Sequence, residues 1–417
     1  MTGTAQVRMA MNGFGLGAGP GQIGAVADGL AWLMAQTSIA AGAPLVPGLD
    51  SAQTRLVNKA RGVNGADMLA RFTLQLKSAT PFLERLAMFW TNHFAVSSTK
   101  STVAPLVVQY ENEAIRPNVC ATFRRMLRAT ATHPAMLYFL NLTASYGPNS
   151  PSGKAHRATY NEDYARELLE LHTLGVQSGY TTADIDQVAL ALTGWYVDTS
   201  SGLGAYDPAR HEPGARSVMA TTIPAGDAQI DALMAFLANH PATATHVCTQ
   251  LAAHFIADTP PADTVAAMVA AWGTDGNLPA VYAAMLGSAS AWQGPAQKYK
   301  TPEGFVLSAA RALNCLGHPL MVWYAMRDLG HWPLCPPSPR GYGDDMASWL
   351  SAAGVLARID TATELAGYAP RKTDPLALIA ELLAPDPASH TLDAMRAAAS
   401  QSEAFALLLA SPEFQWR

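Results

Sequence analysis

Two histidines of the sequence, His93 and His172, occupy positions that suit acid–base chemistry. A helical wheel over residues 81–94 places His93 among large apolar side chains, namely Phe82, Leu86, Phe89 and Trp90. Over residues 159–175 the wheel places His172 in a stripe of leucines. We therefore expect both imidazoles, and Trp90 beside His93, to be buried. A buried imidazole near carboxylates can serve as a general base or a metal ligand, although one taken alone is more often a hydrogen-bonded core residue.

The second of these segments also carries an arc of charged side chains opposite its histidine. Arg166 stands four residues from both Glu162 and Glu170, a spacing typical of salt bridges that support a helix. Asp163, Glu167 and Glu170 crowd within about 60° of the wheel, and like charges four residues apart are mildly destabilising. The arc is therefore interpreted either as an ordinary salt-bridged face or as a site for a cation, which could be a metal, an arginine from elsewhere or a basic partner.

A third polar cluster lies in a long loop predicted over residues 198–223. The stretch Arg210-His211-Glu212-Pro213-Gly214-Ala215-Arg216 holds a histidine and a glutamate between two arginines. Binding residues concentrate on loops carried by a rigid scaffold, and an exposed turn with charged decoration is the alternative. If this loop folds over the charged arc, Arg210 and Arg216 would neutralise Glu167 or Glu170, or a divalent cation would.

These three segments lead to one site hypothesis. We expect the candidate catalytic residues to line a shared polar pocket: His93, Arg166, Glu167, Glu170, His172 and His211. The carboxylates could position a metal-bound water with a histidine as the base, which would suit hydrolysis. The wheel also points the acids and His172 in different directions, so not all six side chains can meet. The sequence identifies neither a metal nor a cofactor.

The elements that must position these residues are helices. Periodicity near 3.6 residues predicts an all-α fold, a compact multi-helix body with long loops and at most a minor hairpin. We expect one body over residues 1–417, with a division into two lobes near 198–226 as the alternative. Long loops, which are usually functional or disordered, are predicted over 144–159, 198–223 and 331–342. Helices are predicted over 67–77, 81–94, 103–118, 120–131, 134–142, 161–173, 182–195, 227–239, 241–256, 262–272, 278–286 and 301–316.

Composition narrows the class of protein. Hydrophobic residues make up 49% of the 417 residues and charged residues 14%, which favours a large core over disorder. The net charge of −5 gives no reason to expect nucleic-acid binding. The four cysteines show no CxxC spacing, which argues against a disulfide framework or a zinc site, and no CxxCH motif is present for covalent haem. We expect no secretory signal and no membrane span, with a cytoplasmic location as the default.

Several motifs, taken in order, resemble those of the bacterial domain-of-unknown-function 1800 family over nearly the whole chain. The most specific are Phe89-Trp90-Thr91-Asn92-His93-Phe94, Gly147-Pro148-Asn149-Ser150, the stretch 161–175, and Leu192-Thr193-Gly194-Trp195. The resemblance implies a helical protein whose activity is unassigned. Its members are commonly encoded beside a second family that is often exported, which implies a partner protein encoded nearby and makes envelope association an alternative to the cytoplasm.

The chain departs from the family pattern in two places. A Leu-Asp-Asn stretch becomes Leu140-Asn141-Leu142 and loses an acid, and a His-Asp-x-Gly-x-Lys loop becomes His211-Glu212-Pro213-Gly214-Ala215-Arg216. Two classes of function stay open. One is a hydrolase-like enzyme, acting with or without a metal ion, whose His/Glu/Arg site lies between helices. The other is a non-catalytic binding or assembly protein that uses long loops on a helical scaffold to engage a partner.

Overall fold

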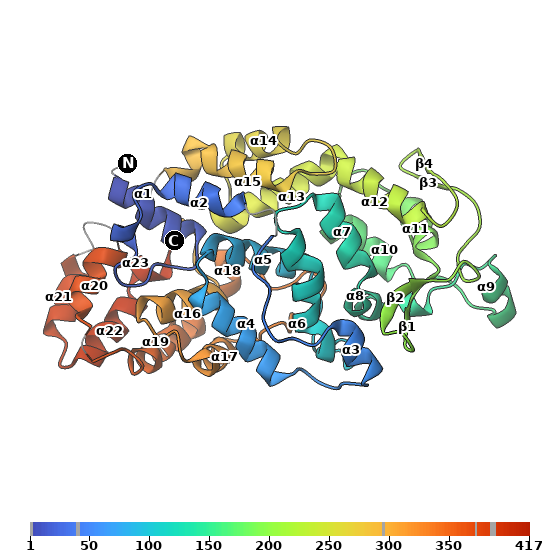
Figure 1. Ribbon diagram of the computed structural model, residues 1–417. Helices are drawn as coiled ribbons and strands as arrows, with labels where there is room; N and C mark the ends of the chain where they lie inside the picture. The colour runs from blue at the N-terminus through green and yellow to red at the C-terminus, as the bar shows by residue number, and fades with distance from the viewer. Residues whose placement is uncertain (1–2, 39–41, 294–296, 372, 384–388) are drawn as a thin grey trace.

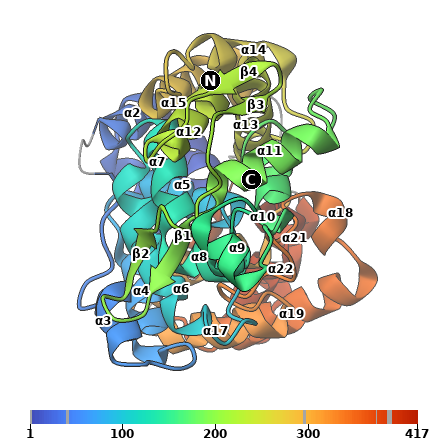
Figure 2. The same cartoon turned by 90° about the vertical axis from the view of Figure 1, so that its right-hand side faces the viewer.

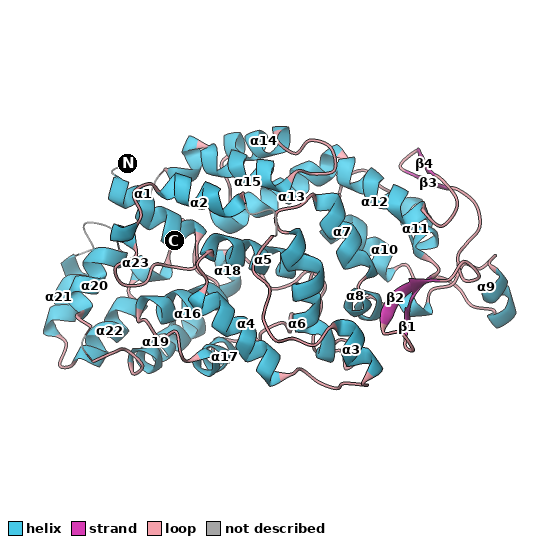
Figure 3. Ribbon diagram, in the orientation of Figure 1, coloured by secondary structure: helices cyan, strands magenta, loops and turns pink. Residues whose placement is uncertain are grey.

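Helices form nearly all of the regular structure in the computed structural model, which describes residues 3–38, 42–293, 297–371, 373–383 and 389–417 (Figure 3). The α-helices of the N-terminal half are α1 (Gly3–Met9), α2 (Gly29–Thr37), α3 (Ala52–Val57), α4 (Gly65–Lys77), α5 (Pro81–His93), α6 (Val107–Tyr110), α7 (Phe123–Thr132), α8 (Pro134–Phe139), α9 (Pro151–His156), α10 (Asp163–Glu167) and α11 (Thr182–Leu192).

The C-terminal half continues the same pattern. Its α-helices are α12 (Gln229–Asn239), α13 (Pro241–Phe255), α14 (Ala262–Ala270), α15 (Leu278–Gly287), α16 (Pro302–Ala312), α17 (Pro319–Asp328), α18 (Met346–Trp349), α19 (Ala352–Ala366), α20 (Pro375–Leu382), α21 (Ser389–Ala397), α22 (Gln401–Ala410) and α23 (Pro412–Gln415). The prediction of a predominantly helical fold is thus confirmed.

The described residues contain two small antiparallel hairpins. They are β1 (Trp195–Asp198) with β2 (Leu203–Tyr206), and β3 (Arg216–Val218) with β4 (Thr221–Ile223). Together with α9 they lie at one end of an elongated body (Figures 1 and 2), whereas α1 lies with the C-terminal helices α20 to α23 at the other end. The long loop predicted over 198–223 therefore holds two hairpins where at most one was expected, and the loop predicted over 144–159 contains α9.

Short π-turns interrupt two of the predicted helices. The helix expected over 103–118 is built from η3 (Ala104–Leu106), α6, the π-turn η4 (Glu111–Ile115) and η5 (Arg116–Asn118). The helix expected over 161–173 is α10 followed by the π-turn η7 (Leu168–His172). A further π-turn is η1 (Ala10–Phe14), and short 3₁₀ turns are η2 (Ile23–Ala25), η6 (Leu142–Ala144) and η8 (Ala289–Trp292). A wheel that advances 100° per residue misplaces side chains in a π-turn, because such a turn is wider.

Local capping chemistry sets several helix starts. Both α8 and α13 begin at a proline, whose missing N–H costs nothing at the first helical position. In each case the preceding histidine accepts a hydrogen bond through Nδ1: His133 from the amide of Ala135 and His240 from that of Ala242. These two helix starts agree with the helices predicted over 134–142 and 241–256.

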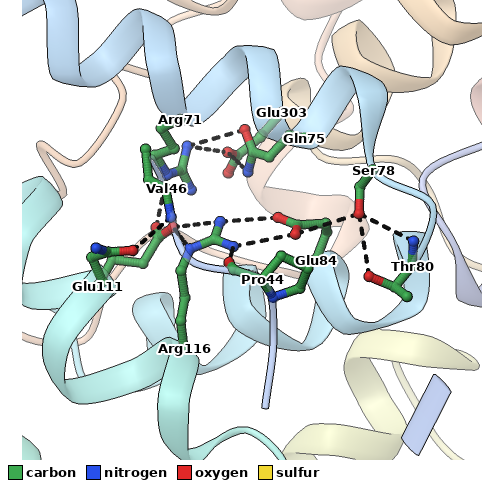
Figure 4. Close-up of polar contacts among 11 residues, drawn as sticks. Pro44, Val46, Arg71, Gln75, Ser78, Thr80, Glu84, Glu111, Arg116 and Glu303 are labelled. Atoms are coloured by element: carbon green, nitrogen blue, oxygen red, sulfur yellow. Dashed lines mark hydrogen bonds and ion pairs between the residues drawn. The ribbon is translucent and has the colours of Figure 1, made fainter. Parts of the chain in front are cut away.

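One continuous cluster of buried apolar side chains extends from Val7 to Phe414. Inside it five charged side chains come together, as Figure 4 shows, and all of them are buried except Glu303, which is partly buried. The guanidinium of Arg116 contacts Glu84 at 2.9 Å and Glu111 at 2.8 Å, and all three side chains are fully buried. Arg71 contacts Glu111 at 2.7 Å and Glu303 at 2.9 Å.

Burial alone would raise the pKa of Glu111, but Arg71 and Arg116 together hold that pKa below its ordinary value. The carboxylate is therefore ionised, and a buried charge persists only when it is paired. The network joins α4, α5, η4, η5 and α16, so these elements keep their relative positions.

None of the helices in the described part of the chain combines the length and the apolar character that a membrane crossing requires.

Replacing Arg116 by methionine tests this network. The substitution leaves Glu84 and Glu111 buried without that cation, so we expect a loss of about 3 to 5 kcal/mol in the free energy of unfolding, measured by urea denaturation. Arg124→Met is the matched control, because Arg124 pairs with Asp275 at 3.2 Å on a partly exposed surface, where a pair contributes about 0 to 1 kcal/mol. Equal losses in the two variants would contradict a special role for the buried network.

Candidate active site

A cavity of about 390 Å³ opens between α5, α13, η7 and the segment 331–345. Its volume lies within the range of small-molecule sites, roughly 300–1,000 Å³. We call it the histidine cavity. Its ionisable lining residues come from distant parts of the chain: Arg71, His93, Glu170, His246, His254, Asp258, Lys298, Glu303, His331, Arg340, Tyr342, Asp344 and Asp345.

Helices α5 and α13 meet along a polar seam beside this cavity. Residues four apart on each helix form the seam: Arg85, Phe89 and His93 on α5, and His246, Gln250 and His254 on α13. Arg85 Nε lies 3.4 Å from His254 Nε2, and His93 Nδ1 lies 3.1 Å from Gln250 Oε1. The seam therefore runs antiparallel, because the start of α5 meets the end of α13.

The π-turn η7 supplies acceptors for two of the imidazoles. Carbonyls at a helix end lack partners within the helix, and here His93 Nε2 lies 3.1 Å from the carbonyl oxygen of His172. His246 Nε2 lies 3.2 Å from that of Leu171. The same turn places Glu170 in the cavity wall. A π-turn at a cavity fits the tendency of such turns to occur at functional sites.

These contacts fix the tautomers of His93 and His246. A neutral imidazole has one donor and one acceptor nitrogen, so His93 Nε2 donates to the His172 carbonyl and its Nδ1 accepts. The amide nitrogen of Gln250 must then donate to His93 Nδ1. This orientation places the amide oxygen of Gln250 3.1 Å from His246 Nε2, where it accepts. Amide oxygen and nitrogen have nearly the same shape, and the hydrogen-bond partners decide between them. In this arrangement each group faces a partner of the right kind.

All three clustered histidines are neutral near pH 7. Burial, followed by the neighbouring His246, lowers the pKa of His93 to about 4. Burial and the imidazoles of His93 and His246 lower the pKa of His172 to about 3, and burial also lowers the pKa of His246. The rings of His93 and His172 lie 6.2 Å apart, centre to centre.

A carboxylate held by cationic and imidazole groups forms another part of the wall. His254 Nδ1 lies 3.1 Å from both oxygens of Asp344, so this nitrogen carries the proton. Lys298 Nζ, which is almost fully buried, contacts Asp258 at 2.7 Å and Asp344 at 3.4 Å. Burial alone would raise the pKa of Asp344, but His254, Lys298 and Arg85 hold it below its ordinary value. Asp344 is therefore ionised, and about 29% of its side chain stays exposed.

The segment 331–345 is fastened to α5 and closes the cavity. The Asn92 side chain bonds both main-chain groups of Tyr342, at 2.9 and 2.8 Å. The ring of Tyr342 stacks on His331 with centroids 4.0 Å apart. His331 is 7% exposed, lines the cavity, and its Nδ1 has no hydrogen-bond partner among the described residues. The loop predicted over 331–342 is thus an ordered wall of the site.

The structure brings three of the six predicted site residues together. His93 and Glu170 line the histidine cavity, and His172 lies directly behind His93. The predicted burial of His93, His172 and Trp90 is confirmed, at 7%, 1% and 0% exposure.

Arg166 and Glu167 do not line the cavity. Arg166 contacts Glu162 at 3.3 Å and Glu170 at 3.6 Å, which matches the interpretation as an ordinary salt-bridged face. Glu167 is partly buried, and burial followed by Glu170 raises its pKa, against the partial opposition of Arg340.

The expectation that His211 shares the pocket is wrong, because its loop is tied to another part of the protein. His211 Nδ1 donates to the carbonyl of Thr193 at 2.8 Å, and Glu212 accepts from the amide and side chain of Asn149 at 2.8 and 2.7 Å. A Cβ on Gly147 would lie 2.4 Å from the Glu212 backbone, so the Gly147-Pro148-Asn149-Ser150 motif and this loop pack as a clamp.

The flanking arginines likewise do not neutralise Glu167 or Glu170. Arg210 pairs with Asp207 at 3.1 Å, and Arg216 donates to the carbonyls of Pro213 and Gly214.

Sequence reasoning missed most of the cavity. His254, Lys298 and Asp344 come together only through tertiary packing, since they lie on α13 and two separate loops. One signal was present: His246, Gln250 and His254 follow a four-residue spacing on a predicted helix. No group of three or more His, Cys, Asp or Glu side chains in the described residues is arranged to hold a metal ion.

The fold and the cavity define a predominantly helical protein with a polar cavity at the seam of two antiparallel helices. The chain belongs to the family described as "Protein of unknown function (DUF1800)", whose model matches residues 9–416. This confirms the resemblance drawn from the motifs. No curated protein and no solved structure matches the chain significantly.

The depressed pKa values of the clustered histidines predict a loss of stability in acid. The unfolded chain takes up these protons below about pH 6.5, whereas native His93 does so only near pH 4. The contribution of neutral His93 to the free energy of unfolding is therefore fully present above about pH 6.5. It is lost as the pH falls toward 4, and the loss amounts to roughly 3 kcal/mol.

Thermal unfolding between pH 4.5 and 7.5 measures this effect. His172→Leu should flatten the dependence of the melting temperature on pH, with the exposed His156→Leu as the matched control. An unchanged pH dependence in His172→Leu would show that this imidazole is not a source of the acid sensitivity.

Proposed function

We propose that this protein is an enzyme, hydrolase-like, whose active site is the histidine cavity. One observation carries the proposal: an ionised carboxylate, Asp344, is held between His254 and Lys298 in the wall of a cavity large enough for a small molecule. Titratable groups whose pKa values are shifted by burial and by specific partners, and which gather in a concave site, are typical of catalytic centres.

Each member of this cluster has a role that its contacts support. Asp344 is the reacting carboxylate, in the unprotonated state that a base or nucleophile requires. His254 is a positioning residue, because its two ring nitrogens contact Asp344 and Arg85. Lys298 supplies positive charge where negative charge would develop on the substrate. The proposal uses no metal ion.

Turnover of chromogenic substrates tests this proposal. We expect the purified protein to hydrolyse at least one class among p-nitrophenyl esters, glycosides and phosphates. Asp344→Asn should lower that rate by about 100-fold or more, the scale of general acid–base contributions. Asp328→Asn is the matched control, because Asp328 is partly exposed and pairs with Arg327 at 2.9 Å on the surface.

Two outcomes would contradict the proposal. One is an Asp344→Asn variant that retains the wild-type rate. The other is an absence of turnover of every substrate class by folded wild-type protein.

A binding or assembly role is the second candidate, and one observation favours it. Helix α19 exposes Val355, Leu356 and Ile359 at 39%, 63% and 44%, next to exposed Leu350. Contiguous exposed apolar residues mark interaction surfaces. If the cavity proves inactive, a partner that protects α19 from hydrogen exchange would support this alternative.

A further inference from the structure

The ionisable side chains that line the histidine cavity carry more negative than positive charge. Five are carboxylates and three are cations: Glu170, Asp258, Glu303, Asp344 and Asp345 against Arg71, Lys298 and Arg340. The lining histidines do not make up the difference, because burial lowers the pKa of each of them and leaves the rings neutral near pH 7. The lining therefore has an excess of two negative charges.

The partners that lie outside the cavity wall do not cancel this excess. They are two cations and two carboxylates: Arg85 acting on Asp344, Arg166 on Glu170, Glu111 on Arg71 and Glu167 on Arg340. Each added cation is thus matched by an added carboxylate, and the excess of two negative charges persists.

The two signs of charge also differ in how far they reach the open space. Lys298 and Arg71 are only 1% and 2% exposed, and Arg340 is the exposed cation of the lining. Three of the carboxylates are exposed at 28%, 29% and 33%: Glu170, Asp344 and Asp258. A ligand that enters the cavity therefore meets carboxylate oxygens, whereas most of the positive charge lies behind them.

Three carboxylates gather around a single lysine at one place in the wall. Lys298 contacts Asp258 at 2.7 Å and Asp344 at 3.4 Å. Asp258 also accepts a hydrogen bond from the amide of Met346 at 2.8 Å, directly after Asp345. The exposed Asp345 serves as the N-cap of α18 and forms no ion pair among the described residues. One buried cation thus serves three carboxylates, which leaves this place suited to a second cation.

Apolar side chains form much of the remaining wall. They come from α5, the loop after it, η7 and two further loops: Met88, Phe89, Val96, Leu171, Val176 and Leu334. A wall that is largely apolar with a few placed charges is usual for small organic ligands. The volume of about 390 Å³ and these apolar side chains suit a cation that carries an organic body.

We infer that the histidine cavity binds an organic ammonium ion, which is an amine carried on an apolar body. The ammonium group would lie against the exposed oxygens of Asp258, Asp344 and Asp345, and the body would pack against the apolar wall. This inference names the substrate class of the proposed enzyme and rests on that function for its catalytic meaning, whereas the binding itself can be measured without turnover.

Three probes of nearly equal shape test the inference by calorimetry. They are benzylamine, which is cationic, benzyl alcohol, which is neutral, and benzoate, which is anionic. We expect the wild-type protein to bind benzylamine more tightly than either of the others by about tenfold or more, the scale of one attractive charge contact near a protein surface. Tighter binding of benzyl alcohol or benzoate, or no binding of any of the three, would overturn the inference.

Two charge-removing variants give the inference a second readout. Asp345→Asn removes a lining carboxylate and keeps a residue that caps a helix well, and Asp258→Asn removes one partner of Lys298. Each should weaken benzylamine binding by about fivefold and leave benzyl alcohol binding unchanged. Asp360→Asn, on the exposed side of α19, is the matched control and should bind both probes as the wild type does.

The same variants show what would contradict the inference. One such result is a pair of folded variants that bind benzylamine as tightly as the wild type. Another is an equal loss of affinity for benzylamine and benzyl alcohol, which would show that the cavity lost its shape and not an attractive charge. Asp258→Asn decides the matter if Asp345→Asn does not fold.

Removing the exposed cation of the lining should act in the opposite direction. Arg340→Gln takes away a positive charge that repels an ammonium group, so we expect benzylamine to bind about threefold more tightly, with no gain for benzyl alcohol. Weaker binding of benzylamine to this variant would count against the inference.

Failure of the inference and failure of the proposed function are distinguishable. Hydrolysis of neutral or anionic substrates through Asp344, without preferential binding of benzylamine, would sink the ammonium inference alone. Selective binding of benzylamine without hydrolysis of any substrate class would support the inference and sink the enzyme proposal.

Discussion

Ion pairs buried inside the apolar core hold the helices of this protein in fixed relative positions. Arg116, Glu84 and Glu111 are fully buried, and Arg71 and Glu303 extend the network toward the histidine cavity (Figure 4). Separating a buried ion pair leaves each charge buried without its counter-charge, which is costly. The helices that carry these residues therefore cannot shift independently. Only 14% of the residues are charged, and several of these charged side chains are buried in the core.

Helix α5 connects the buried ion-pair network to the histidine cavity. Glu84 on α5 belongs to the network, whereas the next residue, Arg85, faces His254 across the seam. One turn further on, the same face carries Phe89 and then His93. The network therefore fixes one side of the helix while the other side builds the cavity, and Asn92 fastens the closing segment at Tyr342.

What could be predicted from the sequence was local. The burial of His93 and the helix starts at the His-Pro pairs depend on neighbouring residues, and both were predicted. The π-turn at the end of the predicted 161–173 helix was not, because a regular wheel assumes an α-helix, and this turn brings Glu170 to the cavity. Ion pairs such as that of Arg71 with Glu303 join residues more than 200 positions apart, and no spacing in the sequence could reveal them.

The protonation state of His254 shows whether Asp344 is held ionised by a neutral imidazole at the cavity wall. Nitrogen-15 NMR of the ring distinguishes its tautomers and its charge. We predict a neutral ring at pH 7 with the proton on Nδ1, because that nitrogen donates to Asp344 while Nε2 accepts from Arg85. A ring charged at pH 7, or one with the proton on Nε2, would contradict it.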